Sequence, residues 1–215
     1  MPSIKMDDFG LYFITDSRLT RKSVIEDVKS AIESGVKVIQ YREKEASAGS
    51  MVKEALEIKK LCMQNKVLFL INDRIDIALA VDADGVHLGQ DDIPCSYARK
   101  LLGRKKIIGI SASSAEEALQ NEKAGADYTG IGPIYGTTTK KDAKAPIGLE
   151  PIRQLQGRLK IPFVTIGGIN EANIDEVLGA GARNVAIISA IVAKGSVSER
   201  IKYFTKKISK SNSNF

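Results

Sequence analysis

The chain has 215 residues, of which 43% are hydrophobic, and a formal net charge of +6. This length suffices for one sizeable core, and no apolar run approaches the roughly 18 uninterrupted residues of a membrane helix. The basic residues lie in short scattered clusters without interleaved aromatic residues, which disfavours nucleic acid as a partner and favours small anions. We expect no nucleic-acid or membrane partner, and a cytoplasmic location because the first residues lack the apolar stretch of a secretory signal.

Apolar or β-branched runs alternate with segments of helical periodicity along the whole chain. Apolar runs without polar alternation are typical of parallel strands that are covered by helices on both faces. The strands that we expect are 11–15, 36–41, 67–72, 85–88, 107–111, 128–132, 163–167 and 185–189. Strict alternation of these eight strands with helices predicts an α/β fold of the (β/α)8 TIM-barrel type, with an open doubly wound sheet as the alternative.

No linker divides the chain, so we expect residues 1–215 to form one domain, with a frayed polar tail at 210–215. Between the second and third expected strands, residues spaced by three and four positions predict a helix, namely Val52, Ala55, Leu56, Lys59, Lys60 and Met63. The one long polar connection, 135–146, follows the sixth expected strand. Loops of this length in a compact domain are usually lids or binding loops.

Two cysteines, Cys62 and Cys95, lie far apart and lack the paired spacing of zinc ligands. A disulfide framework or a zinc site therefore has no support, and both residues are expected to pack in the core. His87 is the only histidine and lies within the fourth expected strand. No serine has the pattern of a nucleophile elbow, so we expect a packed, hydrogen-bonded histidine and a chemistry that relies on electrostatics.

An amide, a guanidinium and an ammonium alternate at the end of the second expected strand, at Gln40, Arg42 and Lys44. Alternate residues of a strand share one face, so these three side chains form a row of donors opposite Ile39 and Tyr41. A solvated strand end is the ordinary interpretation of one such charged run. Polar residues at the ends of the other expected strands argue against this ordinary interpretation.

Barrel enzymes place their sites at the carboxyl ends of the strands. The polar and glycine residues that follow the other expected strands are Asn72, Asp73, Asp91, Asp92, Ser111, Thr137, Thr139, Lys140, Gly167, Gly168 and Ser189. Cations, carboxylates and hydroxyls gathered at one rim predict a site for phosphates with a divalent metal, and a diphosphate is the natural ligand.

Asp73 and Asp92 follow adjacent strands and are hard oxygen ligands of the kind that Mg²⁺ prefers. An isolated Asn-Asp pair is more often a turn or a helix cap, and the sequence does not decide between Asp91 and Asp92. Gly167 and Gly168 can form a tight turn, but they also leave backbone amides accessible to a phosphate.

The motifs QYREK, IND, DGVHLGQDD, GISAS, GADYTGIGPIYGTTTKKDAKAPIG, IGGI and AIISAI occur in this order. In this combination the chain, from about residue 12 to residue 191, closely resembles the thiamine-phosphate synthase family. The resemblance implies a barrel with a Mg²⁺ cofactor and two small-molecule substrates, hydroxymethylpyrimidine diphosphate and a thiazole phosphate. Their condensation would release diphosphate and form thiamine monophosphate in thiamine biosynthesis.

The resemblance also implies the roles of the site residues. The pyrimidine diphosphate would be held by Gln40, Arg42, Lys44, Asn72 and Lys140, with Ser111 on the pyrimidine. Asp73 and Asp92 would ligate Mg²⁺. The thiazole phosphate would be held by Thr137, Thr139, Gly168, Ile188 and Ser189, the last two largely through the backbone. We expect direct catalytic roles for Arg42, Lys44, Lys140 and Ser111.

Two positions depart from the family pattern. Ser113 stands where the family often has histidine, and Gly136 stands where it often has proline. Glycine in place of proline is expected to loosen the hinge of the lid. The threonines assigned to binding are present despite both changes.

The reaction is expected to be a largely dissociative displacement without a covalent enzyme intermediate, because the aminopyrimidine can delocalise the positive charge left on its methylene. The thiazole brings its own nucleophile, so the protein would contribute mainly positioning. Two alternatives are a related thiazole tautomerase and a non-catalytic phosphate-binding barrel. Neither requires the diphosphate and metal apparatus of Lys44, Asn72, Asp73 and Asp92. The helix faces predict no particular oligomeric state.

Overall fold

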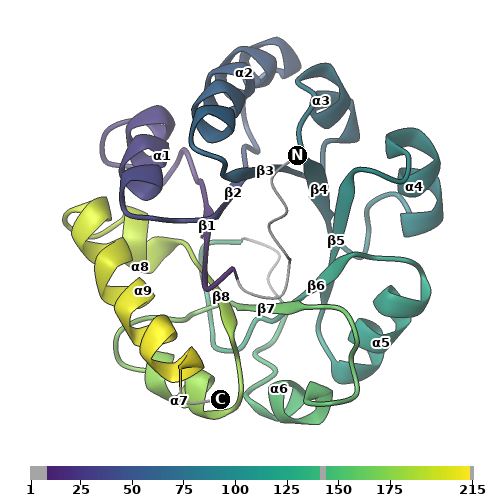
Figure 1. Ribbon diagram of the computed structural model, residues 1–215, viewed down its shortest axis with the longest axis vertical. Helices are drawn as coiled ribbons and strands as arrows, with labels where there is room; N and C mark the ends of the chain where they lie inside the picture. Colours follow the sequence, from purple (N-terminus) through teal and green to yellow (C-terminus); the bar gives the residue numbers. More distant parts are fainter. Residues whose placement is uncertain (1–8, 141–143, 214–215) are drawn as a thin grey trace.

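Eight parallel strands form a closed barrel in which each strand pairs with the next and β8 returns to β1 (Figure 1). The computed structural model describes residues 9–140 and 144–213. The strands are β1 (Leu11–Ile14), β2 (Val38–Tyr41), β3 (Leu68–Asn72), β4 (Gly85–Leu88), β5 (Ile107–Ala112), β6 (Tyr128–Ile131), β7 (Phe163–Ile166) and β8 (Asn184–Ile187). The closed barrel confirms the predicted fold and excludes the open sheet, and each expected strand overlaps an observed one.

Helices surround the barrel on its outer face (Figure 1). They are α1 (Val24–Glu33), α2 (Ala48–Gln64), α3 (Ile75–Ala80), α4 (Cys95–Leu102), α5 (Ala115–Lys123), α6 (Glu150–Leu155), α7 (Ile174–Gly179), α8 (Ser189–Val192) and α9 (Val197–Asn212). Four helices begin after a serine whose side chain accepts a hydrogen bond from the amide three residues later, at Ser23, Ser47, Ser114 and Ser196. Such caps satisfy a backbone donor that the helix leaves unpaired, so the sequence itself sets these helix starts.

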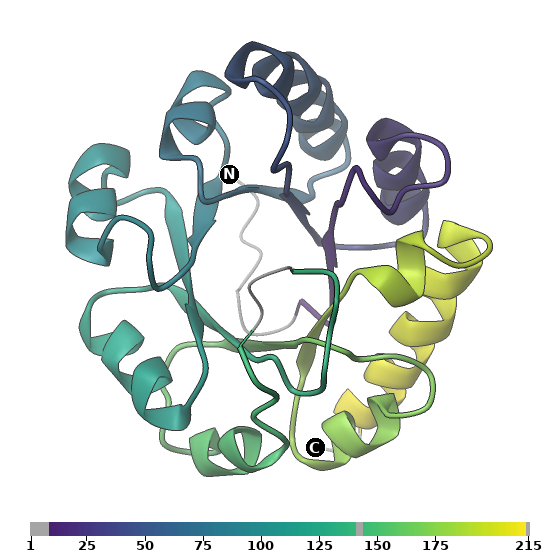
Figure 2. The ribbon, with the colours of Figure 1, turned by 180° about the vertical axis from the view of Figure 1, so that it is seen from behind.

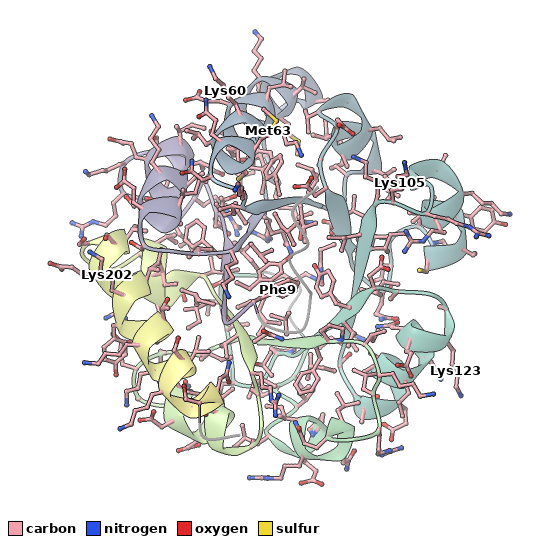
Figure 3. All side chains as sticks on the ribbon, in the orientation of Figure 1. Phe9, Lys60, Met63, Lys105, Lys123 and Lys202 are labelled. Carbon is pink, nitrogen blue, oxygen red and sulfur yellow. The ribbon has the colours of Figure 1, made fainter. Side chains whose placement is uncertain are left out.

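Apolar side chains fill two concentric layers. Ile39 and Tyr41 of β2 point outward and pack under the helices, whereas Val38 points into the barrel beside Tyr12. Gln40 also points inward and contacts Tyr12, which confirms the predicted alternation along this strand. Figure 3 shows Phe9 at the centre of the barrel, while its labelled lysines extend outward at the periphery.

The buried face of α2 matches the expected one only in part. Ala55 and Cys62 are buried as expected, together with Met51 and Ile58, whereas Leu56 is 50% exposed and Met63 is 67% exposed. The helix was predicted correctly, and its buried stripe lies to one side of the expected one. Spacings of three and four residues fit both stripes, and only packing against the strands selects one of them.

The carboxyl-terminal helix extends further than expected. Helix α9 continues to Asn212, so fraying does not begin at Lys210, and residues 214–215 lie outside the described part of the chain. Phe204 and Ile208 of this helix are buried, and the Asn212 side chain donates a hydrogen bond to the carbonyl of Arg183. These contacts hold the last turn despite its polar sequence.

Both cysteines are buried with free thiols, as expected of packing residues, and burial raises the pKa of Cys62 to about 12. None of the helices within residues 9–140 and 144–213 is long and apolar enough to cross a membrane.

Close approach of β4 and β5 depends on a glycine. A Cβ atom on Gly85 would lie 2.0 Å from the carbonyl oxygen of Ile107, its partner residue on β5. We predict that Gly85→Ala lowers the free energy of unfolding by about 1–3 kcal/mol, because the two strands must separate. Urea denaturation measures this change.

Gly49→Ala in α2 is the matched control, because an added Cβ there meets no atom within 4 Å. It should leave stability unchanged or slightly raised, since alanine favours helix more than glycine does. Equal unfolding midpoints for the two variants would contradict this account of the barrel packing.

Candidate active site

A pocket of about 300 Å³ opens at the carboxyl ends of the strands. Residues 132–140, which follow β6, reach over this end of the barrel, which faces the viewer in Figure 2. The pocket is lined by all the residues to which the sequence assigns a role: Gln40, Arg42, Lys44, Asn72, Asp73, Asp92, Ser111, Thr137, Thr139, Lys140, Gly168, Ile188 and Ser189. The structure therefore brings these residues together from β2 through β8, while their individual roles stay predictions.

Arg42 is held in place by a carboxylate that the sequence interpretation missed. Its Nη1 donates to Asp16 Oδ2 at 2.6 Å, and the Asp16 side chain is only 1% exposed. Asp16 also accepts from Arg18, through Nε at 3.2 Å and Nη2 at 2.9 Å. Since Asp16 directly follows the first expected strand, the same strand-end rule that selected Arg42 could have found it.

Arg18 links this cluster to the segment after β6. Its Nη2 donates to the carbonyl oxygen of Thr139 at 2.7 Å. One buried carboxylate, Asp16, thus fixes the guanidinium of Arg42 and, through Arg18, contacts a segment that covers the pocket.

Lys44, Asp73 and Asp92 form the charged wall on the β2 to β4 side. Lys44 Nζ lies 2.5 Å from Asp73 Oδ2. The backbone of Asp73 has the left-handed conformation, with φ of 60°, and its amide donates to the carbonyl of His87 at 2.8 Å. A non-glycine residue in this conformation is strained, and such strain occurs often at functional sites.

Asp92, and not Asp91, turns toward Asp73. Asp92 Oδ2 accepts a hydrogen bond from the amide of Gly89 at 2.7 Å, while Asp91 is exposed. Burial raises the pKa of Asp92, and the adjacent Asp73 raises it further, against the opposing effects of the Gly89 amide and Lys44. Two carboxylates in this arrangement favour a hard cation between them.

No group of three histidine, cysteine or acidic side chains could hold a metal ion within the described part of the chain. A cation at Asp73 and Asp92 would therefore complete its coordination with water or substrate oxygens. Mg²⁺ is commonly bound in this way, through one or two carboxylates and substrate phosphate.

Polar side chains also line the floor of the pocket inside the barrel. His87 is hydrogen-bonded through both ring nitrogens, to the Tyr128 hydroxyl at 2.8 Å and to Ser111 Oγ at 3.0 Å. Burial lowers its pKa to about 4, so the ring is neutral near pH 7. The expectation of a packed, hydrogen-bonded histidine is confirmed, but the ring also lines the pocket.

On the opposite side the pocket is formed by hydroxyls and backbone. The Thr139 amide donates to Thr137 Oγ1 at 3.3 Å. At the end of β7, Gly168 has φ of 65°, and a Cβ atom there would lie 2.5 Å from the carbonyl oxygen of Gly136. Glycine at position 168 therefore permits the segment after β6 to lie against this strand end.

The departures from the family pattern are also part of this region. Ser113 Oγ accepts a hydrogen bond from Lys144 Nζ at 2.9 Å. Residues 141–143, which include Lys141, lie outside the described part of the chain. Gly136 has open space around its Cα, since an added Cβ would meet nothing within 4 Å. The looser lid hinge expected from this glycine stays a prediction.

A barrel with cations, paired carboxylates and hydroxyls around one opening belongs to the class of enzymes that act on phosphorylated substrates. The family model described as thiamine monophosphate synthase matches residues 11–191. A thiamine-phosphate synthase of Methanosarcina barkeri is 51% identical over 203 residues, which cover 94% of this chain and 92% of that protein. A thiamine-phosphate synthase of Chloroflexus aurantiacus is 51% identical over 191 residues, 88% of each chain.

Among solved structures, thiamine phosphate pyrophosphorylase from Pyrococcus furiosus superposes with a TM-score of 0.86 at 41% identity, over 94% of this chain and 96% of that one. The chain belongs to the thiamine-phosphate synthase family. It is a transferase of thiamine biosynthesis.

We predict that Asp16→Asn destabilises the protein by about 3–5 kcal/mol, because it leaves the nearly buried Arg42 without its counter-charge. Arg18→Gln is the control, since the Arg18 side chain is 27% exposed and its loss keeps the pair between Asp16 and Arg42 intact. It should cost less than about 1 kcal/mol. Equal losses in urea denaturation would show that Asp16 does not support Arg42.

The single histidine gives a second prediction, on the pH dependence of stability. Between pH 6.5 and about 4 the unfolded chain binds a proton at His87 that the folded chain does not. The contribution of His87 to the free energy of unfolding is therefore complete above pH 6.5 and falls as the pH drops toward 4. Denaturation of wild type and His87→Asn at pH 5 and pH 7 measures it.

Because carboxylates titrate in the same pH range, the quantity to compare is the difference in free energy of unfolding between wild type and His87→Asn. The advantage of wild type over His87→Asn should shrink from pH 7 to pH 5. An advantage that grows at pH 5 would mean that the folded protein holds His87 protonated.

Proposed function

We propose that this transferase joins the methylene carbon of hydroxymethylpyrimidine diphosphate to the ring nitrogen of a thiazole phosphate and releases diphosphate. The observation that carries the proposal is the convergence of Lys44, Asp73 and Asp92 with Arg42 at one opening. This combination binds a diphosphate together with a cation. A simple phosphate site would need only the cations.

The diphosphate is bound on the β2 to β4 side of the pocket by Arg42, Lys44 and Asn72, and by Lys140 from the connection after β6. A guanidinium carries five N–H donors, and Arg42 gives one to Asp16, so others remain for phosphate oxygens. Because Asp16 fixes the side chain before substrate arrives, little conformational entropy is lost on binding. Lys44 and Lys140 neutralise further negative charge on the diphosphate.

Asp73 and Asp92 fit Mg²⁺, since their oxygens are hard ligands and the raised pKa of Asp92 reflects burial and a like charge that a cation would relieve. When bound, Mg²⁺ would neutralise charge on the diphosphate. Lys44, which contacts Asp73, is placed to share its ammonium between this carboxylate and the substrate.

In the reaction, the bond between the methylene carbon and the diphosphate oxygen breaks, and its electron pair leaves with diphosphate. The thiazole nitrogen then supplies the pair for the new carbon–nitrogen bond. Arg42, Lys44 and Lys140 stabilise the charge that grows on the leaving group, which lowers the barrier more than it strengthens substrate binding. The aminopyrimidine delocalises the positive charge on its methylene, so the displacement is largely dissociative and needs no covalent enzyme intermediate.

The thiazole phosphate is bound on the β6 to β8 side. Thr137 and Thr139 offer hydroxyls and Gly168 offers a backbone free of a Cβ atom. Ile188 and Ser189, at the start of α8, offer backbone amides. Holding both substrates in one pocket aligns the nitrogen with the methylene carbon, and this alignment is the main contribution of the protein.

The prediction is that diphosphate is released only when both substrates and Mg²⁺ are present, and that Asp92→Asn lowers the rate on the order of 100-fold. The variant should also need more Mg²⁺ for half-maximal activity. A coupled assay for diphosphate, with Mg²⁺ varied, measures both effects.

Asp91→Asn is the matched control, because Asp91 is the exposed neighbour in the same loop. It should keep the wild-type Mg²⁺ requirement. Unchanged metal dependence in Asp92→Asn would remove that residue from the metal site, and binding of a thiazole phosphate without any turnover would indicate a non-catalytic barrel.

A further inference from the structure

Five side chains form a continuous chain of hydrogen bonds across the interior of the barrel. Gln40 Nε2 donates to the Tyr12 hydroxyl at 2.8 Å, and the hydroxyls of Tyr12 and Tyr128 lie 2.8 Å apart. The Tyr128 hydroxyl bonds to His87 Nδ1 at 2.8 Å, and His87 Nε2 bonds to Ser111 Oγ at 3.0 Å. These residues, here called the polar relay, connect β2, β1, β6, β4 and β5.

Glycines in β5 and β6 leave room for the rings of Tyr128 and His87, which lie in the middle of this relay. A Cβ atom on Gly109 of β5 would lie 2.0 Å from the ring of Tyr128, and one on Gly130 of β6 would lie 3.0 Å from His87 Cε1. Both positions lack a side chain where a ring passes over the strand. Tyr128 can therefore cross β5 and reach His87 on β4.

Each hydroxyl of the relay has one hydrogen to donate. Tyr12 and Tyr128 are each 1% exposed, and burial raises the pKa of both, so both stay protonated. Among residues 9–140 and 144–213, the Tyr12 hydroxyl forms hydrogen bonds only with Gln40 and Tyr128. Since Gln40 donates to Tyr12, Tyr12 must donate to Tyr128.

The same reasoning determines which atoms of Tyr128, His87 and Ser111 donate their hydrogens. Tyr128, which accepts from Tyr12, donates its own hydrogen to His87 Nδ1. The neutral imidazole then carries its hydrogen on Nε2 and donates it to Ser111 Oγ. The hydroxyl hydrogen of Ser111 is left for the pocket, and at the other end the amide oxygen of Gln40 is left to accept.

We infer that the polar relay fixes the hydrogen-bonding pattern of the pocket floor, a donor at Ser111 and an acceptor at Gln40, and so selects an aminopyrimidine ring. Gln40 and Ser111 lie on β2 and β5, on different sides of the barrel. A ring that carries an acceptor nitrogen on one edge and an amino donor on the opposite edge satisfies both. A ring with the reverse pattern would leave the Ser111 hydrogen without an acceptor and the Gln40 oxygen without a donor.

This inference rests on the proposed function for the identity of the ring, and it makes Tyr12, Tyr128 and His87 positioning residues. They act through Gln40 and Ser111, which contact the substrate. Reversal of the relay would require the Gln40 amide to turn its oxygen toward Tyr12 and an N–H group toward the pocket, and it would move the His87 hydrogen to Nδ1. The tautomer of His87 therefore distinguishes the two arrangements.

The first test is the tautomer of the one histidine, measured by nitrogen-15 NMR on the untagged wild-type protein. The expected result is a neutral ring with hydrogen on Nε2. Tyr128→Phe removes the donor to Nδ1, so its spectrum should shift toward a mixture of both tautomers. A hydrogen on Nδ1 in wild type would overturn the inference whether or not the protein is an active synthase.

The second test is kinetic and uses the two substrates with Mg²⁺. Tyr128→Phe should raise the KM for the pyrimidine diphosphate about tenfold and leave the KM for the thiazole phosphate unchanged. Its preference for the natural pyrimidine over an analogue without the amino group should fall. Tyr203→Phe, on the outer helix α9 and 39% exposed, is the matched control and should match wild type.

Unchanged pyrimidine preference in Tyr128→Phe, or equal changes in both KM values, would also overturn the inference. If Tyr128→Phe does not fold, Tyr12→Phe and the wild-type tautomer test the same chain of hydrogens. Absence of diphosphate release by wild type would instead contradict the proposed function. The NMR result would still decide the direction of the hydrogen bonds in the relay.

Discussion

Repulsion between two carboxylates at the mouth of the barrel governs the site. Asp73 and Asp92 lie together, partly shielded from water, with the ammonium of Lys44 on Asp73 and the Gly89 amide on Asp92. Such a pair destabilises the free protein, and the left-handed backbone of Asp73 adds strain. The cation and the anionic substrate that we propose for this site would offset that cost.

Barrel closure is what brings these charges together. The carboxyl ends of parallel strands meet at one opening, so residues that are far apart in sequence face one ligand. The site has three levels: the polar relay at the floor, charged and hydroxyl-bearing walls, and the segment after β6 above them. Asp16 connects the levels, because it fixes Arg42 in the wall and holds Arg18, which in turn bonds to Thr139.

The strands and the set of pocket residues followed from the sequence, since alternation along a strand and the strand-end rule need only local information. Gln40 faces inward because Ile39 and Tyr41 face the helices. The choice of Asp92 over Asp91 depends on how the loop after β4 folds back, which neighbouring residues do not reveal. Tyr128 in an apolar strand looks like a core residue, and only the register with Gly109 on β5 shows that it reaches His87.

The most direct test of the central claim is the position of a cation in the ternary complex. Crystals grown with Mn²⁺ in place of Mg²⁺ and with inorganic diphosphate would reveal the metal by its anomalous scattering. The account predicts one peak within about 2.0–2.2 Å of a carboxylate oxygen of both Asp73 and Asp92, with a diphosphate oxygen as a further ligand. A peak elsewhere, or diphosphate bound with neither aspartate on the metal, would contradict it.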